Sequence, residues 1–129
     1  MNTHHALTAI VPCNDLDASE AFYIRLGFTR PDSDRPPAGD DDSYRILAHD
    51  KGGALHLTQA VEGWVVAGRN PFGLYFYTED VDSVAAGFQG AIIEKDGPSH
   101  KPWGMYEFAL SDPQGTLVRI GWPSRLMKG

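Results

Sequence analysis

The sequence predicts an α+β protein built from two tandem βαβββ units. The chain has 129 residues, the size of one compact domain. Short runs rich in β-branched and aromatic residues alternate with two segments of helical periodicity, and the order of these elements in the first half returns in the second. We therefore expect one domain over residues 1–129, with repeats at about 5–62 and 70–124. Its strands would form a concave mixed sheet with the helices on the outer face.

The first unit is expected to open with an apolar strand at Ala6–Cys13. A helix follows at Asp17–Leu26, where apolar residues recur at helical spacing, and Gly27 is placed to end it. Phe28 then begins a return strand. Two further strands complete the unit around a glycine turn: Tyr44–Ala48 and Ala54–Ala60.

The segment Pro31–Ser43 is too rich in proline, glycine and aspartate for regular structure. It is longer than most connections in a compact domain, which indicates either a binding lid or a poorly ordered segment. We interpret its aspartates as solvated charges, although they could also attract a cationic ligand. They are Asp32, Asp34, Asp40, Asp41 and Asp42.

The second unit repeats this order, with a strand at Phe72–Thr78 and a short helix at Glu79–Phe88. The phrases "NDLD" and "EDVD" end at Asp17 and Asp82, an offset of 65 residues (82 − 17). Three more strands are expected: Ala91–Lys95, Met105–Ser111 and Thr116–Trp122.

Composition narrows the possible partners and location. The net charge of −6 argues against nucleic acid, because phosphate binding needs a clustered basic surface. No apolar run approaches the length that spans a bilayer, and the start of the chain does not resemble a secretory signal, so we expect a cytoplasmic protein. The single cysteine, Cys13, cannot form an internal disulfide.

Period-two alternation separates two faces of the expected sheet. The face away from the helices carries three polar groups, His56, Glu107 and Arg119, among small or apolar residues. A buried charge is costly unless paired, so we expect Arg119 to meet Glu107, an acidic group of a ligand, or water. The opposite face is apolar and suits packing under the helices: Leu55, Leu57, Leu74, Phe76, Phe108, Leu110, Val118 and Ile120.

Aromatic side chains are frequent near the same face, and flat rings with polar edges suit planar heteroaromatic ligands. Trp103 is the candidate that we favour, since it lies on a loop beside Gly104 with no expected helix to pack against. The alternative is that most of these rings are core or dimer contacts. The set is Trp64, Tyr75, Trp103, Tyr106 and Trp122.

Three phrases resemble the vicinal-oxygen-chelate superfamily of glyoxalases, extradiol dioxygenases and bleomycin-resistance proteins. They are Asp15–Phe28, Pro102–Gly104 and Asp112–Ile120. In the enzymes of that family, the resemblance implies a divalent metal held by residues on the first and last strand of each unit. The matching positions here are Thr8, His56, Gly73 and Arg119. Of these only the histidine is a metal ligand, and arginine has no lone pair to give, so no metal or other cofactor is expected.

The chain therefore resembles the bleomycin-resistance branch, which implies a homodimer that sequesters an antibiotic-like, planar or cationic small molecule without catalysis. The ligand-binding candidates are His56, Tyr75, Trp103, Glu107 and Arg119. One alternative is a glyoxalase-type lyase or dioxygenase with an atypical metal site at His56 and Glu107. Another is an accessory module whose cavity is filled by its own side chains, closed by the Arg119–Glu107 pair.

Overall fold

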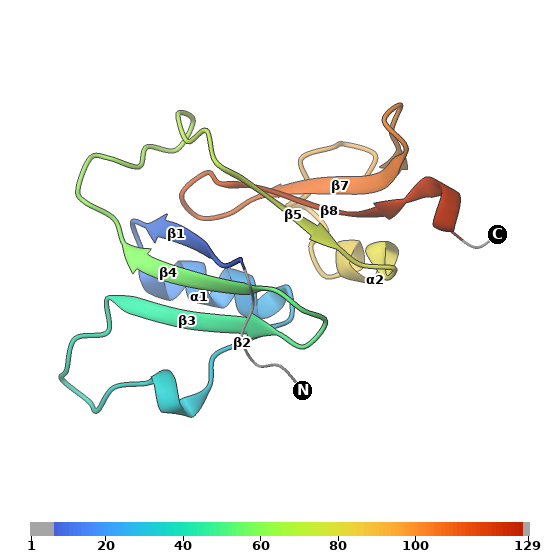
Figure 1. Ribbon diagram of the computed structural model, residues 1–129. Coiled ribbons are helices and arrows are strands. Elements are labelled where there is room, and N and C mark those ends of the chain that lie inside the picture. Colours follow the sequence, from blue (N-terminus) through green and yellow to red (C-terminus); the bar gives the residue numbers. More distant parts are fainter. Residues whose placement is uncertain (1–6, 128–129) are drawn as a thin grey trace. The chain divides into compact units, whose positions relative to one another are not determined.

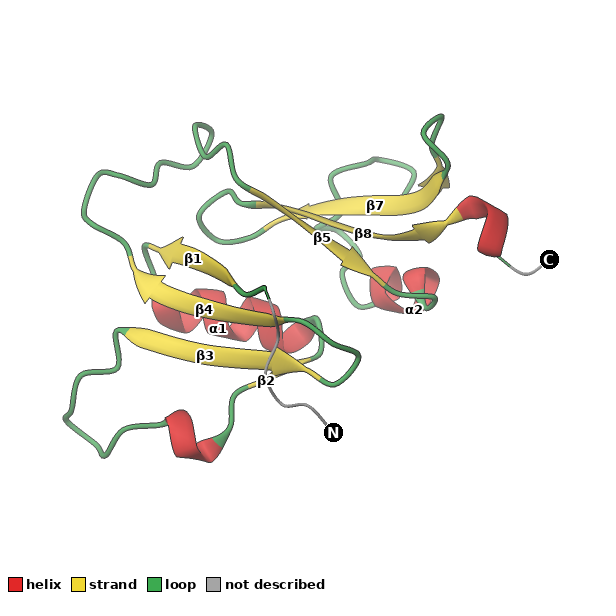
Figure 2. Ribbon diagram, in the orientation of Figure 1, coloured by secondary structure: helices red, strands yellow, loops and turns green. Residues whose placement is uncertain are grey.

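The computed structural model describes residues 7–127. The chain divides into two compact units, one ending at Val66 and one beginning at Ala67. Each unit holds one four-stranded sheet of mixed direction and one α-helix packed on a face of that sheet (Figures 1 and 2). The α+β class and the tandem order of the elements are confirmed, with the strands divided into one sheet per unit.

The first unit contains β1 (Ala9–Cys13), α1 (Leu16–Arg25), β2 (Phe28–Thr29), β3 (Tyr44–His49) and β4 (Ala54–Gln59), with a short 3₁₀ helix at Asp32–Asp34. The strand order is β1-β4-β3-β2, in which β1 and β4 are parallel. The Asp15 side chain caps α1 by accepting a hydrogen bond from the Ala18 amide at 3.1 Å. The helix ends before Gly27, whose φ of 105° is a conformation that favours glycine. Ala6, expected in the first strand, lies outside the described residues.

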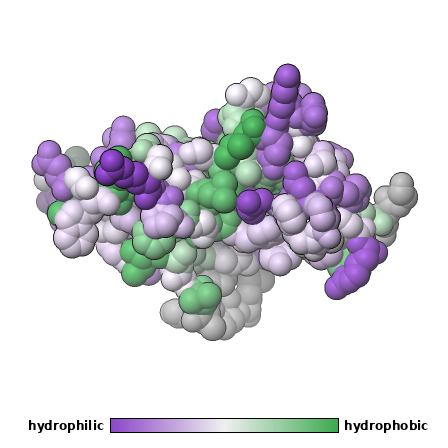
Figure 3. Space-filling model, turned by 90° about the horizontal axis from the view of Figure 1, so that it is seen from above, coloured by the Kyte–Doolittle hydropathy of each residue, from purple (hydrophilic) through white to green (hydrophobic). Residues whose placement is uncertain are grey.

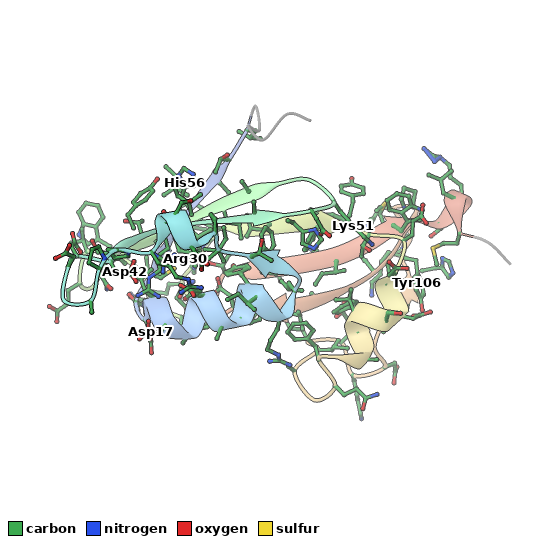
Figure 4. All side chains as sticks on the ribbon, turned by 90° about the horizontal axis from the view of Figure 1, so that it is seen from below. Asp17, Arg30, Asp42, Lys51, His56 and Tyr106 are labelled. Atoms are coloured by element: carbon green, nitrogen blue, oxygen red, sulfur yellow. The ribbon has the colours of Figure 1, made fainter. Side chains whose placement is uncertain are left out.

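Two buried arginines tie the loop after β2 to the first unit. Arg30 donates to Asp34 at 2.8 Å and also pairs with Asp42, so it holds the loop near both of its ends. Arg45 donates to the Asp42 carbonyl at 3.0 Å and, on α1, to Asp17 at 2.9 Å and Glu20 at 3.1 Å. Figure 4 shows Arg30 beside Asp42 and Asp17. The expectation that the loop aspartates are merely solvated is wrong for Asp34 and Asp42, because each pairs with the buried guanidinium of Arg30.

The contact between Arg30 and Asp42 also shifts the pKa values of both side chains. The hydrogen bond from Arg30, together with the charges of nearby arginines, outweighs burial and lowers the pKa of Asp42. The hydrogen bond to Asp42 raises the pKa of Arg30. Both shifts favour the charged forms, so the pair stays ionised around neutral pH.

The second unit contains β5 (Gly73–Tyr77), α2 (Val81–Ala86), β6 (Ser99–His100), β7 (Met105–Ser111) and β8 (Leu117–Pro123), followed by a 3₁₀ turn at Ser124–Leu126. The strand order is β5-β8-β7-β6, in which β5 and β8 are parallel. The inward face of β7 and β8 is fully apolar, as the alternation predicts. Its residues Phe108, Leu110, Val118 and Ile120 are each at most 1% exposed.

The strand predicted at Ala91–Lys95 does not form, and that prediction is wrong. Ile93 makes one strand-like contact, donating its amide to the Ala109 carbonyl at 2.9 Å. The next donor on β7, the Ala109 amide, bonds instead to the Glu94 side chain at 2.8 Å. A side chain thus replaces the backbone carbonyl that a ladder would need. The short strand β6 pairs with β7 further along.

No helix among residues 7–127 is long and apolar enough to cross a membrane. The face of the molecule drawn in Figure 3 is largely hydrophilic or neutral, with apolar residues in smaller patches.

Candidate functional site

The second unit brings together four of the five predicted ligand-binding residues. Tyr75 of β5 pairs in register with Arg119 of β8, and Glu107 of β7 pairs with Gly121 of β8. Trp103 lies on the turn between β6 and β7. We call Tyr75, Trp103, Glu107 and Arg119 the Glu107 cluster. It lies on the sheet face opposite the buried apolar residues.

Glu107 is the centre of this cluster and is fully buried. Its Oε1 accepts hydrogen bonds from the Tyr75 hydroxyl at 2.7 Å and from the Trp103 indole Nε1 at 3.2 Å. Its Oε2 accepts from Nη1 of Arg119 at 2.7 Å. The predicted Arg119–Glu107 pair is confirmed. Both carboxylate oxygens are engaged, which offsets the cost of burying the charge.

The contacts shift two pKa values in a consistent way. Burial alone would raise the pKa of the Glu107 carboxyl, but the hydrogen bonds from Tyr75, Trp103 and Arg119 together outweigh it and lower the pKa. Burial and the bond to the Glu107 carboxylate raise the pKa of Tyr75. The acid therefore stays ionised and the phenol stays protonated, so the hydroxyl remains a donor over a wide pH range.

The partners of Glu107 reach the surface even though Glu107 does not. Trp103 is 60% exposed, Tyr75 is 38% exposed, and the Arg119 side chain is 38% exposed. The Arg119 guanidinium carbon lies 5.9 Å from the centre of the Trp103 ring, and Tyr77 packs on Tyr75 with ring centres 4.8 Å apart. The result is an exposed aromatic surface with one guanidinium, whose side chains are held in position by hydrogen bonds to the buried Glu107 carboxylate.

Gly121 makes this arrangement possible, and sequence reasoning missed it. A Cβ at this position would lie 2.7 Å from Cβ of Glu107 and would clash with the Tyr75 hydroxyl. The absence of a side chain leaves the space in which the hydroxyl and the carboxylate meet. The available signal was a glycine interrupting a strand of larger residues, "LVRIGWP", which often marks a close approach.

His56, the fifth predicted residue, belongs to the first unit, whereas the Glu107 cluster is formed by residues of the second unit. Its Nδ1 lies 2.7 Å from the Tyr44 hydroxyl, and the two rings pack edge to face with centres 5.2 Å apart. In register beside it are Ile10 of β1 and Ile46 of β3, which are 61% and 39% exposed. Sequence reasoning assigned no polar partner to His56, because Tyr44 stands on another strand at the edge of the aspartate-rich loop.

The residues at the positions where the resemblance places metal ligands do not fit a resident divalent ion. Thr8 and Gly73 offer no imidazole or carboxylate, and the Arg119 guanidinium is a cation that donates to Glu107. Glu107 already has both oxygens engaged by donors. Within residues 7–127 no three His, Cys, Asp or Glu side chains are grouped so as to hold a metal.

Two tandem βαβββ units, each with one sheet and one covering helix, define the class of protein to which the chain belongs. The chain is a member of the Glyoxalase/Bleomycin resistance protein/Dioxygenase superfamily, whose sequence model matches residues 3–120. No curated relative matches the chain.

Solved structures share the fold over nearly their whole length. A bleomycin-binding protein complexed with bleomycin has 25% sequence identity and a TM-score of 0.69, over 92% of this chain and 98% of that chain. An antibiotic-binding protein from a Streptomyces species has 24% identity and a TM-score of 0.67, over 96% and 100% of the two chains. A lactoylglutathione lyase from Agrobacterium tumefaciens has 21% identity and a TM-score of 0.66, over 97% and 98%. The last two likenesses describe the fold alone.

Proposed function

We propose that this protein binds and sequesters an antibiotic-like small molecule with a planar part, without a metal and without catalysis. The observation that carries the proposal is Arg119, bound to Glu107 at 2.7 Å where an enzyme of the family would need a metal ligand. The bleomycin-binding neighbour supports the same type of role. We further propose that the protein acts as a cytoplasmic homodimer.

Tyr75 and Trp103 would supply the flat surface for such a ligand, and Arg119 a charged edge. Glu107 is too deeply buried to touch the ligand as it stands, so its role would be to hold the other three side chains in place. A site organised in this way before binding loses less conformational freedom when the ligand arrives. His56 and Tyr44 would offer a second, smaller polar contact site for the ligand on the first unit.

The alternative is a metal-dependent lyase or dioxygenase with an atypical site. The specific observation in its favour is the fold shared with a lactoylglutathione lyase. It would require donors other than Glu107, because both oxygens of that carboxylate already accept hydrogen bonds within the second unit.

Metal analysis beside a thermal-shift screen tests the proposal. The protein would be purified without chelator and melted alone and with bleomycin and other planar antibiotics. We expect substoichiometric metal and a melting temperature that rises with the concentration of a bound compound. A stoichiometric metal, together with turnover of a glyoxalase or dioxygenase substrate, would contradict the proposal.

A further inference from the structure

The charge of the ligand can be read from the Glu107 cluster. Residues in register on this face of β5, β8 and β7 form two rows: Tyr75, Arg119 and Ala109, then Tyr77, Gly121 and Glu107. These rows contain two charged side chains, one of each sign. Only the cation is accessible, because Glu107 is fully buried whereas the Arg119 side chain is 38% exposed.

Arg119 keeps hydrogen-bonding capacity after it has paired with Glu107. A guanidinium has five N–H donors in a planar fork, and the bond to Glu107 uses Nη1. No buried side-chain nitrogen or oxygen within residues 7–127 lacks a partner. Any donor of Arg119 that has no protein partner therefore reaches solvent, beside the exposed rings of Tyr75 and Trp103.

We infer that this site prefers a planar aromatic compound carrying an anionic or strongly accepting oxygen group, such as a carboxylate, phenolate or quinone carbonyl, over a cationic one. The ring would pack on Tyr75 and Trp103, and the oxygen would accept from Arg119. A ligand ammonium would meet the like charge of Arg119, while the carboxylate that could attract it is buried and engaged. This inference rests on the proposed function. The sequence left open whether the ligand is planar or cationic, and the cluster favours a planar ligand that is not a cation.

Three anthracene probes of matched shape provide the test. They are anthracene-9-carboxylate, 9-anthracenemethanol and 9-(aminomethyl)anthracene, which are an anion, a neutral alcohol and a cation. Their affinities would be measured by fluorescence anisotropy in about 0.15 M salt, which screens charges beyond about 8 Å and so limits the effect of the net charge of −6. We expect the dissociation constant of the carboxylate probe to be lower than that of the ammonium probe by about tenfold or more.

Arg119→Gln should abolish that preference, because glutamine can still donate to Glu107 but carries no charge. The matched control is Arg125→Gln, which removes the same charge from an exposed position on the 3₁₀ turn Ser124–Leu126 and should keep the preference. Arg119→Lys keeps the charge without the planar fork and should retain part of the preference. Thermal melts would verify that the variants are folded, and the ranking of the three probes by wild-type protein tests the inference even if one variant fails to fold.

Equal or tighter binding of the ammonium probe, or a preference that survives Arg119→Gln, would overturn the inference while leaving the proposed function in place. Failure of all three probes would also overturn it, because a planar anion is the ligand that it requires. The bleomycin thermal shift would then decide separately whether the proposed function stands.

Discussion

Arg30 in the first unit and Glu107 in the second are buried charged side chains that are neutralised in opposite ways. Arg30 in the first unit is a buried cation whose Nε, Nη1 and Nη2 all donate to oxygens of Glu20, Asp34 and Asp42. Glu107 in the second unit is a buried anion that accepts from three donors. The side-chain hydrogen bonds of Arg30 all go to residues of α1 and of the loop after β2. The three side chains that donate to Glu107 are instead partly exposed to solvent.

This difference distinguishes a cluster that we expect to be structural from the Glu107 cluster, which we propose binds a ligand. A buried charge whose hydrogen-bonding atoms are all paired inside the protein holds its segment in place and has no group left for a ligand. A buried charge that organises exposed partners can instead present them, fixed in position, to a ligand. We call Arg30, Glu20, Asp34 and Asp42 the Arg30 cluster. It should govern stability, whereas the Glu107 cluster should govern both stability and binding.

Arg30→Met should give the largest loss of stability. It leaves three carboxylates without their common cation, and removing one partner of a buried ion pair costs about 3 kcal/mol in the free energy of unfolding. Urea denaturation measures this, and affinity for a ligand of the second unit should not change in the folded variant. Arg35→Met is the control, because Arg35 is 47% exposed with contacts of 3.6 and 3.8 Å and should cost at most about 0.5 kcal/mol. Equal effects of the two substitutions would contradict the closed cluster.

Gly121→Ala should disrupt the Glu107 cluster by overpacking. The added methyl group would force the Tyr75 hydroxyl or Glu107 to move, at a cost of about 2 kcal/mol, and ligand binding should weaken with it. Gly73→Ala provides the matched control on the neighbouring strand. There a Cβ would meet its nearest atom at 3.6 Å, an ordinary contact, so denaturation midpoint and affinity should stay near wild type. A Gly121→Ala protein with unchanged affinity would argue against the close packing of the cluster.

Tyr75→Phe should make stability less sensitive to acid. A carboxyl whose pKa is lower in the folded state stabilises above its unfolded pKa of about 4.3, and this stabilisation is lost as the pH falls through the folded value. Removing the Tyr75 donor raises the folded pKa of Glu107 toward its unfolded value, so the variant has about 1.5 kcal/mol less stability at neutral pH. Acid then removes less stability from the variant than from the wild type, and the loss ends at a higher pH. The measurement is the denaturation midpoint as a function of pH.

Tyr106→Phe is the corresponding control. The Tyr106 hydroxyl donates to Asp82 at 2.5 Å in an exposed setting near α2, and this bond raises the pKa of Tyr106 to about 12 (Figure 4). Its loss should change stability at neutral pH by no more than about 0.5 kcal/mol. If both tyrosine variants lost stability equally, the special role of the buried carboxylate would be refuted.

Trp103→Leu should have the smallest effect on stability and a clear effect on binding. The ring is 60% exposed, but its indole N–H donates to the buried Glu107 at 3.2 Å, so stability should fall by about 1 kcal/mol, less than in Tyr75→Phe. The loss of a flat ring should weaken affinity for a planar ligand. Trp103→Phe keeps a flat ring without the N–H and should retain most of the affinity in a fluorescence titration. Full affinity in the leucine variant would show that the ligand does not pack on this ring.

The sequence predicted features that depend on local pattern. The tandem order follows from the repeated order of elements along the chain. The apolar face of β7 and β8 follows from period-two alternation, and the Arg119–Glu107 pair from the cost of leaving a charge unpaired. The remainder depends on strand register and on contacts between distant residues. Gly121 matters only because β7 places Glu107 beside it, and the Arg30 cluster joins Glu20 of α1 to residues of the loop after β2. The missing strand at Ala91–Lys95 is a similar case, since the Glu94 side chain took the place of a backbone acceptor.

The most direct test of the central claim is nitrogen-15 NMR of side-chain N–H groups during titration with anthracene-9-carboxylate. The Nε–H of Arg119 and the indole N–H of Trp103 should shift with one common saturation curve, whereas the Nε–H of Arg30, bound to Asp34 at 2.8 Å, should not move. Such a result would show that the Glu107 cluster is open to ligand and the Arg30 cluster closed. Saturable binding that leaves the Arg119 and Trp103 signals unchanged, or that shifts Arg30, would contradict the account.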